Sequence, residues 1–187
     1  MSARVAIGVG LRRGAAAADV MALVETALET ARALEPKLDC SGARLFTHES
    51  KRSEQGLVEA ARLLTRDLVF VTEEALAAVD ALVTTRSPRV EALFGIGSMA
   101  EAAALAGAAG FPSPFGRGWR EAPGEGLGSR QDGQASGRAN PADSRAPHPP
   151  FGHLLPMGEG RARPFLLLPR IANASVTCAI AKGDPDA

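Results

Sequence analysis

Two adjacent arginines follow a glycine-rich stretch near the start of the chain, in the sequence Gly8-Val9-Gly10-Leu11-Arg12-Arg13-Gly14. Glycines at a strand-to-helix turn let backbone N–H groups approach a ligand closely, and the N-terminus of the following helix carries partial positive charge. Arginine side chains add forked donors that suit carboxylate and phosphate groups. The stretch therefore predicts a small anion-binding site, for which the candidate residues are Gly8, Gly10, Arg12, Arg13 and Gly14.

A second polar cluster, Thr47 to Glu54, follows the second predicted strand. In open α/β sheets, ligands bind beyond the carboxyl ends of the strands, so this cluster and the glycine-rich stretch are expected to share one edge if their strands are neighbours. Lys51 is the residue best suited to pair with a carboxylate, and an exposed lysine without a ligand is the alternative. We interpret Glu54 as an acid in the first turn of a helix rather than as a general base.

The glycine-rich stretch departs from the dinucleotide-binding fingerprint, which is G-x-G-x-x-G followed by an acidic residue after the second strand. Its third glycine, Gly14, comes one position late, and the second predicted strand ends at Thr47-His48. A nucleotide-binding module is therefore a minor alternative. A tight turn with solvated arginines is the alternative without any ligand.

The sequence shows no convincing catalytic or metal-binding pattern. His48 is the one histidine in the part of the chain that we expect to fold, and nothing in the sequence near Cys40 or Cys178 supports a Cys-His pair. His48 and Glu49 lack a third ligand at metal-binding spacing. The residues therefore favour binding over catalysis, and they predict neither a metal nor a cofactor.

Alternating strands and helices must position these residues. We expect strands at 4–9, 43–47, 68–71, 165–168 and 176–181, and helices at 16–34, 54–64, 73–79, 88–94 and from 99 to about 105. Ser98 and Glu101 are expected to form a capping box for the last of these helices. The pattern predicts a three-layer α/β/α single domain with a mixed sheet and a C-terminal β-hairpin.

One long segment does not fit this pattern. Residues 112–163 are rich in Gly, Pro, Ser and Arg and have no hydrophobic period, and they contain two similar Pro-Phe-Gly segments. Structureless loops of this length are uncommon inside a compact domain. We therefore expect a disordered insertion at 112–163 in a domain formed by residues 1–111 and 164–187, with a functional lid as the alternative.

Composition excludes several classes of protein. The formal net charge is zero, with 21 basic and 21 acidic residues, which argues against a general nucleic-acid binder. We find no apolar run long enough to span a bilayer and no signal-peptide pattern, so we expect a cytoplasmic protein without membrane contact. The excess of arginine over lysine, with abundant alanine and glycine, suggests a bacterial source.

Five short motifs follow one another along the chain in a specific order. They are the turn Ile7 to Gly14; the pattern Thr47, Lys51, Glu54, Gly56 and Leu57; the segment Phe70 to Leu76; the helix Gly97 to Leu105; and the closing hairpin with Leu168-Pro169-Arg170 and Val176 to Ala181. Taken together, they resemble the CobE family and the C-terminal domain of the CbiG proteins of cobalamin biosynthesis. Leu11 stands where this family usually has a cysteine, and His48-Glu49 replaces its Ile-Asp pair.

The resemblance implies a ligand and a role. Corrin-ring precursors carry acetate and propionate side chains, which would suit Arg12, Arg13, Lys51 and helix N-termini such as the one at Ser98 and Glu101. It implies an accessory protein that binds an anionic precorrin or corrinoid intermediate, with other enzymes of the pathway as candidate partners. The alternative that it implies is hydrolysis of a precorrin lactone, as in cobalt-precorrin-5A hydrolase, with Glu49 or Glu54 activating water.

Overall fold

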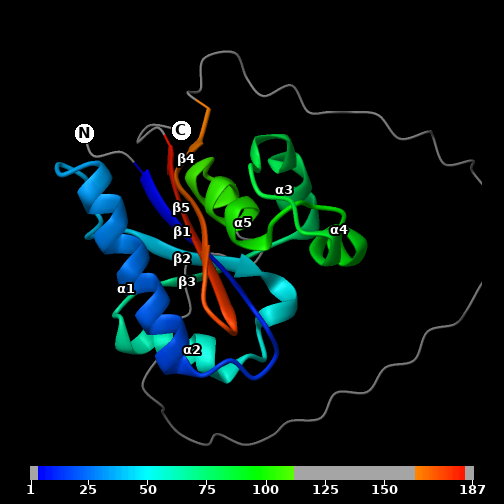
Figure 1. Ribbon diagram of the computed structural model, residues 1–187, viewed down its shortest axis with the longest axis horizontal. Coiled ribbons are helices and arrows are strands. Elements are labelled where there is room, and N and C mark those ends of the chain that lie inside the picture. The colour runs from blue at the N-terminus through cyan, green and yellow to red at the C-terminus, as the bar shows by residue number, and fades with distance from the viewer. Residues whose placement is uncertain (1–3, 112–162, 184–187) are drawn as a thin grey trace, which may run out of the picture. The chain divides into compact units, whose positions relative to one another are not determined.

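Five strands form one mixed sheet at the centre of the computed structural model, which describes residues 4–111 and 163–183 (Figure 1). In sequence order they are β1 (Arg4–Leu11), β2 (Arg44–His48), β3 (Leu68–Val71), β4 (Phe165–Ala172) and β5 (Val176–Gly183). Their order across the sheet is β3-β2-β1-β5-β4. β1, β2 and β3 run parallel, whereas β5 is antiparallel to both β1 and β4.

Helices cover both faces of the sheet (Figure 1). One face packs against α1 (Ala17–Leu34) and α2 (Gln55–Leu63), and the other against α3 (Glu73–Ala78), α4 (Pro88–Phe94) and α5 (Met99–Ala108). Two 3-10 turns, η1 (Glu49–Lys51) and η2 (Asp80–Leu82), lie in the connections. The predicted α/β class with a mixed sheet and a C-terminal hairpin is confirmed.

The parallel strands bring several loops to one edge of the sheet. Because β1 and β2 are parallel neighbours, the loops that follow them leave the sheet at the same edge. The turn between β4 and β5 reaches that edge too, and the Arg12 N–H donates a hydrogen bond to the Ser175 carbonyl at 2.9 Å. Asn173 and Ser175 of this turn also bond to Asp19 in the first turn of α1. The edge is therefore held by contacts that are distant in sequence.

α5 lies directly on β1 because two residues of that strand have no side chain. A Cβ at Gly8 would overlap the Ala100 carbonyl oxygen and the Ala104 backbone nitrogen. All ten residues of α5 are buried, and seven of them are alanine or glycine. Small residues on both elements permit the short separation, and burial of the whole helix explains why its sequence shows no polar face.

Strands β1, β4 and β5 extend beyond their predicted ends. The expected strand end at Val9 is wrong, because pairing with β5 continues from Gly8 through Gly10 to Leu11. β4 and β5 are also longer than expected. The predicted insertion at 112–163 lies outside the described residues except for Arg163, so the predicted domain boundaries stay a prediction.

Among the described residues, no helix alone has the length and hydropathy to span a membrane. α4 and α5 reach those values only when taken together, and they are bent by 63° relative to each other.

Gly8→Ala should destabilise the protein by about 3 kcal/mol or more, because the new methyl group meets helix backbone that cannot move aside without displacing α5. Urea denaturation measures the change. Gly42→Ala is the matched control, since a Cβ at Gly42 meets no atom within 4 Å, and its free energy of unfolding should stay within about 0.5 kcal/mol of the wild type. Equal stability of the two variants would contradict this account of the contact between β1 and α5.

Candidate functional site

The candidate site is the carboxyl edge, by which we mean residues 12–16 after β1, residues 48–54 after β2 and the hairpin turn 173–175. Arg12, Arg13 and Gly14 are exposed there, and Lys51 and Glu54 are half-buried. The structure brings Gly14, Lys51 and Glu54 together through direct contacts. The predicted shared edge is therefore present, and its two loops come from neighbouring strands.

Glu54 joins the two loops. Its Oε2 accepts a hydrogen bond of 2.9 Å from the Gly14 N–H, and its Oε1 lies 3.9 Å from the Lys51 Nζ. Gly14 has a φ of 72°, a left-handed conformation that favours glycine. Glu54 precedes α2 as its N-cap, and its side chain does not cap that helix. The carboxylate thus holds the β1–α1 loop against the β2–α2 loop.

The next residues of the same motif complete this junction. A Cβ at Gly56 would overlap the Ala15 carbonyl oxygen, so glycine lets the first turn of α2 contact the loop before α1. Leu57 is fully buried in the core formed with α1. The pattern Glu54-x-Gly56-Leu57 is explained by three contacts: a carboxylate to a backbone amide, backbone to backbone, and an apolar anchor.

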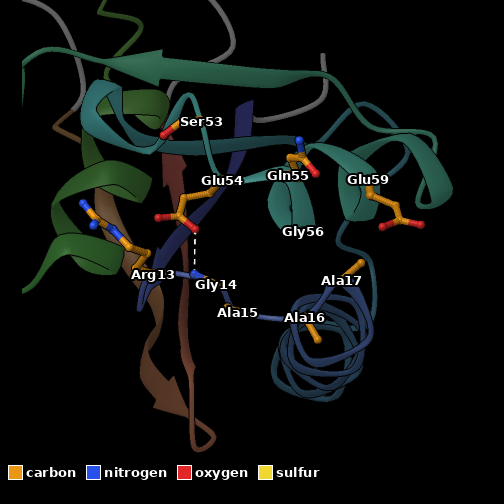
Figure 2. Close-up of a pocket in the computed structure, with 10 residues that line it drawn as sticks. All are labelled: Arg13, Gly14, Ala15, Ala16, Ala17, Ser53, Glu54, Gln55, Gly56 and Glu59. Atoms are coloured by element: carbon orange, nitrogen blue, oxygen red, sulfur yellow. Dashed lines mark hydrogen bonds between the residues drawn. The ribbon is translucent and has the colours of Figure 1, made fainter.

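A shallow hollow of about 640 Å³ lies between the N-termini of α1 and α2 (Figure 2). It is lined by Arg13 to Ala17 and by Ser53 to Gly56 with Glu59. Neither helix has a side-chain cap, so partial positive charge from two helix starts faces this region. Arg13 adds a cation, whereas Glu54 and Glu59 add negative charge on the side of α2. The hollow suits a carboxylate on the Arg13 side, and it disfavours one beside Glu59.

Three of the predicted site residues support the sheet. Thr47 is fully buried, and its Oγ1 donates to the Val9 carbonyl at 2.8 Å. Thr177 does the same for the Gly10 carbonyl at 3.1 Å. Gly8 and Gly10 lie inside β1 beneath α5. Packing accounts for both glycines, and their contact with a ligand stays a prediction.

His48 ends β2 as a neutral, nearly buried imidazole. Its Nδ1 accepts a hydrogen bond from the Ser50 N–H at 3.3 Å and lies 2.8 Å from the Ser50 Oγ. Burial lowers the pKa of His48 and outweighs the opposing effects of Glu49 and Glu73, while Lys51 lowers it further. The Phe94 ring packs edge-on against it, with ring centroids 5.2 Å apart. Its Nε2 is buried and has no hydrogen-bond partner within residues 4–111 and 163–183.

Glu101 has a different role from the one predicted. The capping box is wrong, because the Ser98 side chain makes no cap bond and the Glu101 carboxylate points elsewhere. That carboxylate is fully buried and accepts bonds of 2.6–3.1 Å from the N–H and hydroxyl groups of Thr84 and Thr85 and from the Arg170 N–H. Burial opposes its ionisation, but these bonds outweigh burial and lower the pKa of Glu101. Glu101 therefore has a structural role, and its contact with a ligand stays a prediction.

The two cysteines offer no activated thiol. Burial raises the pKa of Cys40, and it raises that of Cys178 to about 12. Across the described ranges, no three His, Cys, Asp or Glu side chains gather where they could hold a metal ion. Cys178 is a fully buried core residue.

Sequence reasoning missed the hairpin turn as part of the carboxyl edge. Asn173 and Ser175 reach Asp19 across more than 150 positions of sequence, at 3.0 and 2.8 Å. Nothing local marks this contact, because it depends on β5 pairing with β1. The signal that was present is the polar turn itself, in which the Asn173 side chain accepts bonds from the Ser175 and Val176 N–H groups.

Comparison with protein families identifies the chain. Residues 5–121, more than half of it, match the family model described as the cobalamin synthesis G C-terminus. The chain belongs to this CbiG C-terminal family, and thus to the proteins of cobalamin biosynthesis. The matched range includes both loops joined by Glu54, and it ends before the β4–β5 hairpin. A comparison with curated proteins finds no match.

Two solved structures resemble the chain. One is CobE, a protein from the cobalamin (vitamin B12) biosynthetic pathway, with 24% identity and a TM-score of 0.61 over 97% of this chain and 92% of that one. The other is the cobalamin biosynthesis protein chiG from Agrobacterium tumefaciens str. C58, with 24% identity and a TM-score of 0.47 over 95% of this chain and 96% of that one. The first likeness supports the fold.

Glu101→Gln should destabilise the protein by about 3 kcal/mol at neutral pH, because an amide nitrogen would face donors that now meet carboxylate oxygens. Glu29→Gln, at an exposed position of α1, should have little effect. Because the pKa of Glu101 is lowered in the folded state, its stabilisation is present above the ordinary value of 4.5 and is lost as pH falls below it. Urea denaturation should therefore show the two curves converging in acid, and a constant gap would contradict the assignment.

His48 should make stability depend on pH near neutrality. Its pKa is lowered from 6.5 in the folded state, so the unfolded chain binds the proton more readily. Its contribution is complete above pH 6.5 and declines as pH falls below that value. His48→Asn retains an acceptor for the Ser50 N–H and cannot titrate, so the loss of stability between about pH 7 and pH 5 should be smaller in this variant. Identical losses in both proteins would refute this prediction.

Proposed function

We propose that this protein binds an anionic corrin-ring intermediate of cobalamin biosynthesis at the carboxyl edge, as an accessory protein of the pathway. The observation that carries the proposal is the Glu54 junction, in which Glu54 contacts both Gly14 and Lys51 beside the N-termini of α1 and α2. This junction lies inside the matched family region. Corrin precursors carry several acetate and propionate arms, so recognition needs separated groups that bind carboxylates.

The charges at this edge suit such a ligand. Arg12 and Arg13 are exposed on consecutive positions, and each guanidinium can hold a carboxylate through two parallel bonds. The uncapped starts of α1 and α2 add backbone donors. Lys51 lies 3.9 Å from Glu54, a long ion pair at which a second carboxylate can compete.

Binding is favoured over lactone hydrolysis by the state of Glu54. A general base needs a free carboxylate close to the attacking water, and Glu54 already accepts from Gly14 and faces Lys51. Glu49, the other candidate base, is half-buried in η1, and its charge acts to raise the pKa of the neighbouring His48. We therefore propose a protein that holds an intermediate and passes it to other enzymes of the pathway, in the cytoplasm.

The double variant Arg12→Ala, Lys51→Ala should bind cobyrinic acid, a corrin with free carboxyl side chains, at least about tenfold more weakly than the wild type. The corrin chromophore allows titration by absorbance. The control is Lys37→Ala, Arg62→Ala, which removes two exposed cations near the opposite ends of α1 and α2. Both variants should keep the wild-type melting temperature within a few degrees, and the fully esterified methyl ester of the probe should bind weakly. Unchanged affinity in the folded double variant would contradict the proposal.

A lactone-containing precorrin separates the two activities. Incubated with the purified protein, it should be retained in stoichiometric amount with its colour unchanged. Repeated turnover with release of a two-carbon fragment would replace the binding role with hydrolysis.

A further inference from the structure

Two buried polar atoms on the α5 side of the sheet have no hydrogen-bond partner among the residues that the structure describes. They are His48 Nε2 and Ser98 Oγ, in residues that are 6% and 1% exposed. Buried polar groups are nearly always hydrogen-bonded, and an unsatisfied one costs about 1–3 kcal/mol. Two such atoms at the same end of the sheet therefore call for an explanation other than stability.

Both atoms belong to the side of the sheet that α5 covers. Phe46 of β2 faces the core on that side, and His48, two residues later, lies on the same side, where it meets Phe94. Gly10, on the neighbouring strand, faces the start of α5, and a Cβ there would lie 3.3 Å from the Met99 Cβ and 3.5 Å from the Ala100 nitrogen. The imidazole and the first turn of α5 therefore occupy the same end of this layer.

The His48 tautomer makes Nε2 a donor. Because Nδ1 accepts the Ser50 N–H, the proton of the neutral ring resides on Nε2. The Ser98 hydroxyl is a second donor. Ser98 is the N-cap of α5, a helix of ten residues without a side-chain cap, so its first amides add further donors and partial positive charge. A negatively charged oxygen, such as that of a carboxylate, is the ligand atom that suits this group of donors.

The loop that presents Ser98 is held in place from behind. The Gly97 N–H donates to Asp80 Oδ1 at 2.7 Å, and Asp80 Oδ2 is bound by Arg86 at 2.9 Å. The Gly97 carbonyl accepts from the Ser87 N–H at 2.8 Å. Phe94 ends α4, a helix of seven residues in which none is fully buried. Because the loop that carries Ser98 is held rigidly and α4 is weakly anchored, α4 can move to admit a ligand without unfolding of the core.

We propose that His48 Nε2, Ser98 Oγ and the first amides of α5 form a second carboxylate-binding site, which takes one acid arm of the corrin ligand. This proposal rests on the proposed function and extends it across the sheet, because the hollow beside Arg13 belongs to the α1 and α2 side whereas this site belongs to the α5 side. A broad macrocycle lying over the strand ends can place one arm on each side.

Sodium propionate serves as the probe for this site, with sodium chloride at equal ionic strength as its reference. In NMR spectra of the ¹⁵N-labelled protein, propionate should cause saturable shifts of the His48 ring nitrogen and of the Ala100 amide. Ser98→Ala and His48→Asn should each raise the half-saturation concentration, read at Ala100, at least fivefold. Ser87→Ala, a serine at the start of α4 without a cap bond, should behave as the wild type.

The melting temperature distinguishes a ligand-binding role of Ser98 from a purely stabilising one. Ser98→Ala removes an unpartnered buried hydroxyl, so its melting temperature should equal or exceed that of the wild type while its affinity for propionate falls. Shifts no larger than those with chloride, or equal shifts in wild type and both variants, would overturn the second site.

Titration of the same proteins with cobyrinic acid separates the two proposals. The second site predicts weaker corrin binding in Ser98→Ala and His48→Asn. Equal corrin affinity in wild type and both variants would refute the second site and leave the proposed function standing. Propionate shifts in a protein that does not bind cobyrinic acid would support the second site and refute the proposed function.

Discussion

The absence of side chains at Gly8 and Gly10 is the constraint on which the rest of the structure depends. It lets the alanine-rich α5 lie directly on the central strand, with its start over Gly10 and its later turns over Gly8. A larger residue at Gly8 would push the helix away from β1, and one at Gly10 would overlap the Thr177 hydroxyl and crowd the start of α5. The same contact makes α5 the most buried helix of the described residues, so packing and the position of the candidate site have one cause.

Carboxylates serve as internal connectors in this fold. Glu54 joins two loops by accepting one backbone amide, and Glu101 joins three segments by accepting two hydroxyls and three amides. Asp80 likewise holds Gly97 and Arg86. An ionised acid can satisfy several orphan donors at once, which explains why irregular connections pack tightly here without long stretches of regular structure.

Membership in a family of cobalamin biosynthesis fits the balance of charge at this edge. The chain has no net charge, so attraction to the acidic ligand that we propose would have to be local. Exposed arginines, uncapped helix starts and, among the described residues, two unpartnered donors lie near the ends of the strands, whereas Glu54 and Asp19 bond to neighbouring loops. This distribution supports recognition of separate carboxylate arms rather than of one compact anion.

The sequence by itself determined the family, the α/β class and most of the helices and strands. Apolar periodicity and breaks at Gly and Pro are local signals, and the order of the short motifs is specific. The sequence also indicated that Gly14, Lys51 and Glu54 share an edge, because the ends of parallel strands must meet. Only the tertiary structure decided that Gly8 and Gly10 serve helix packing, that Glu101 is an internal connector, and that His48 and Ser98 retain unsatisfied donors. These roles depend on which distant backbone atoms approach each residue, and that depends on sheet order and helix placement rather than on neighbours in the chain.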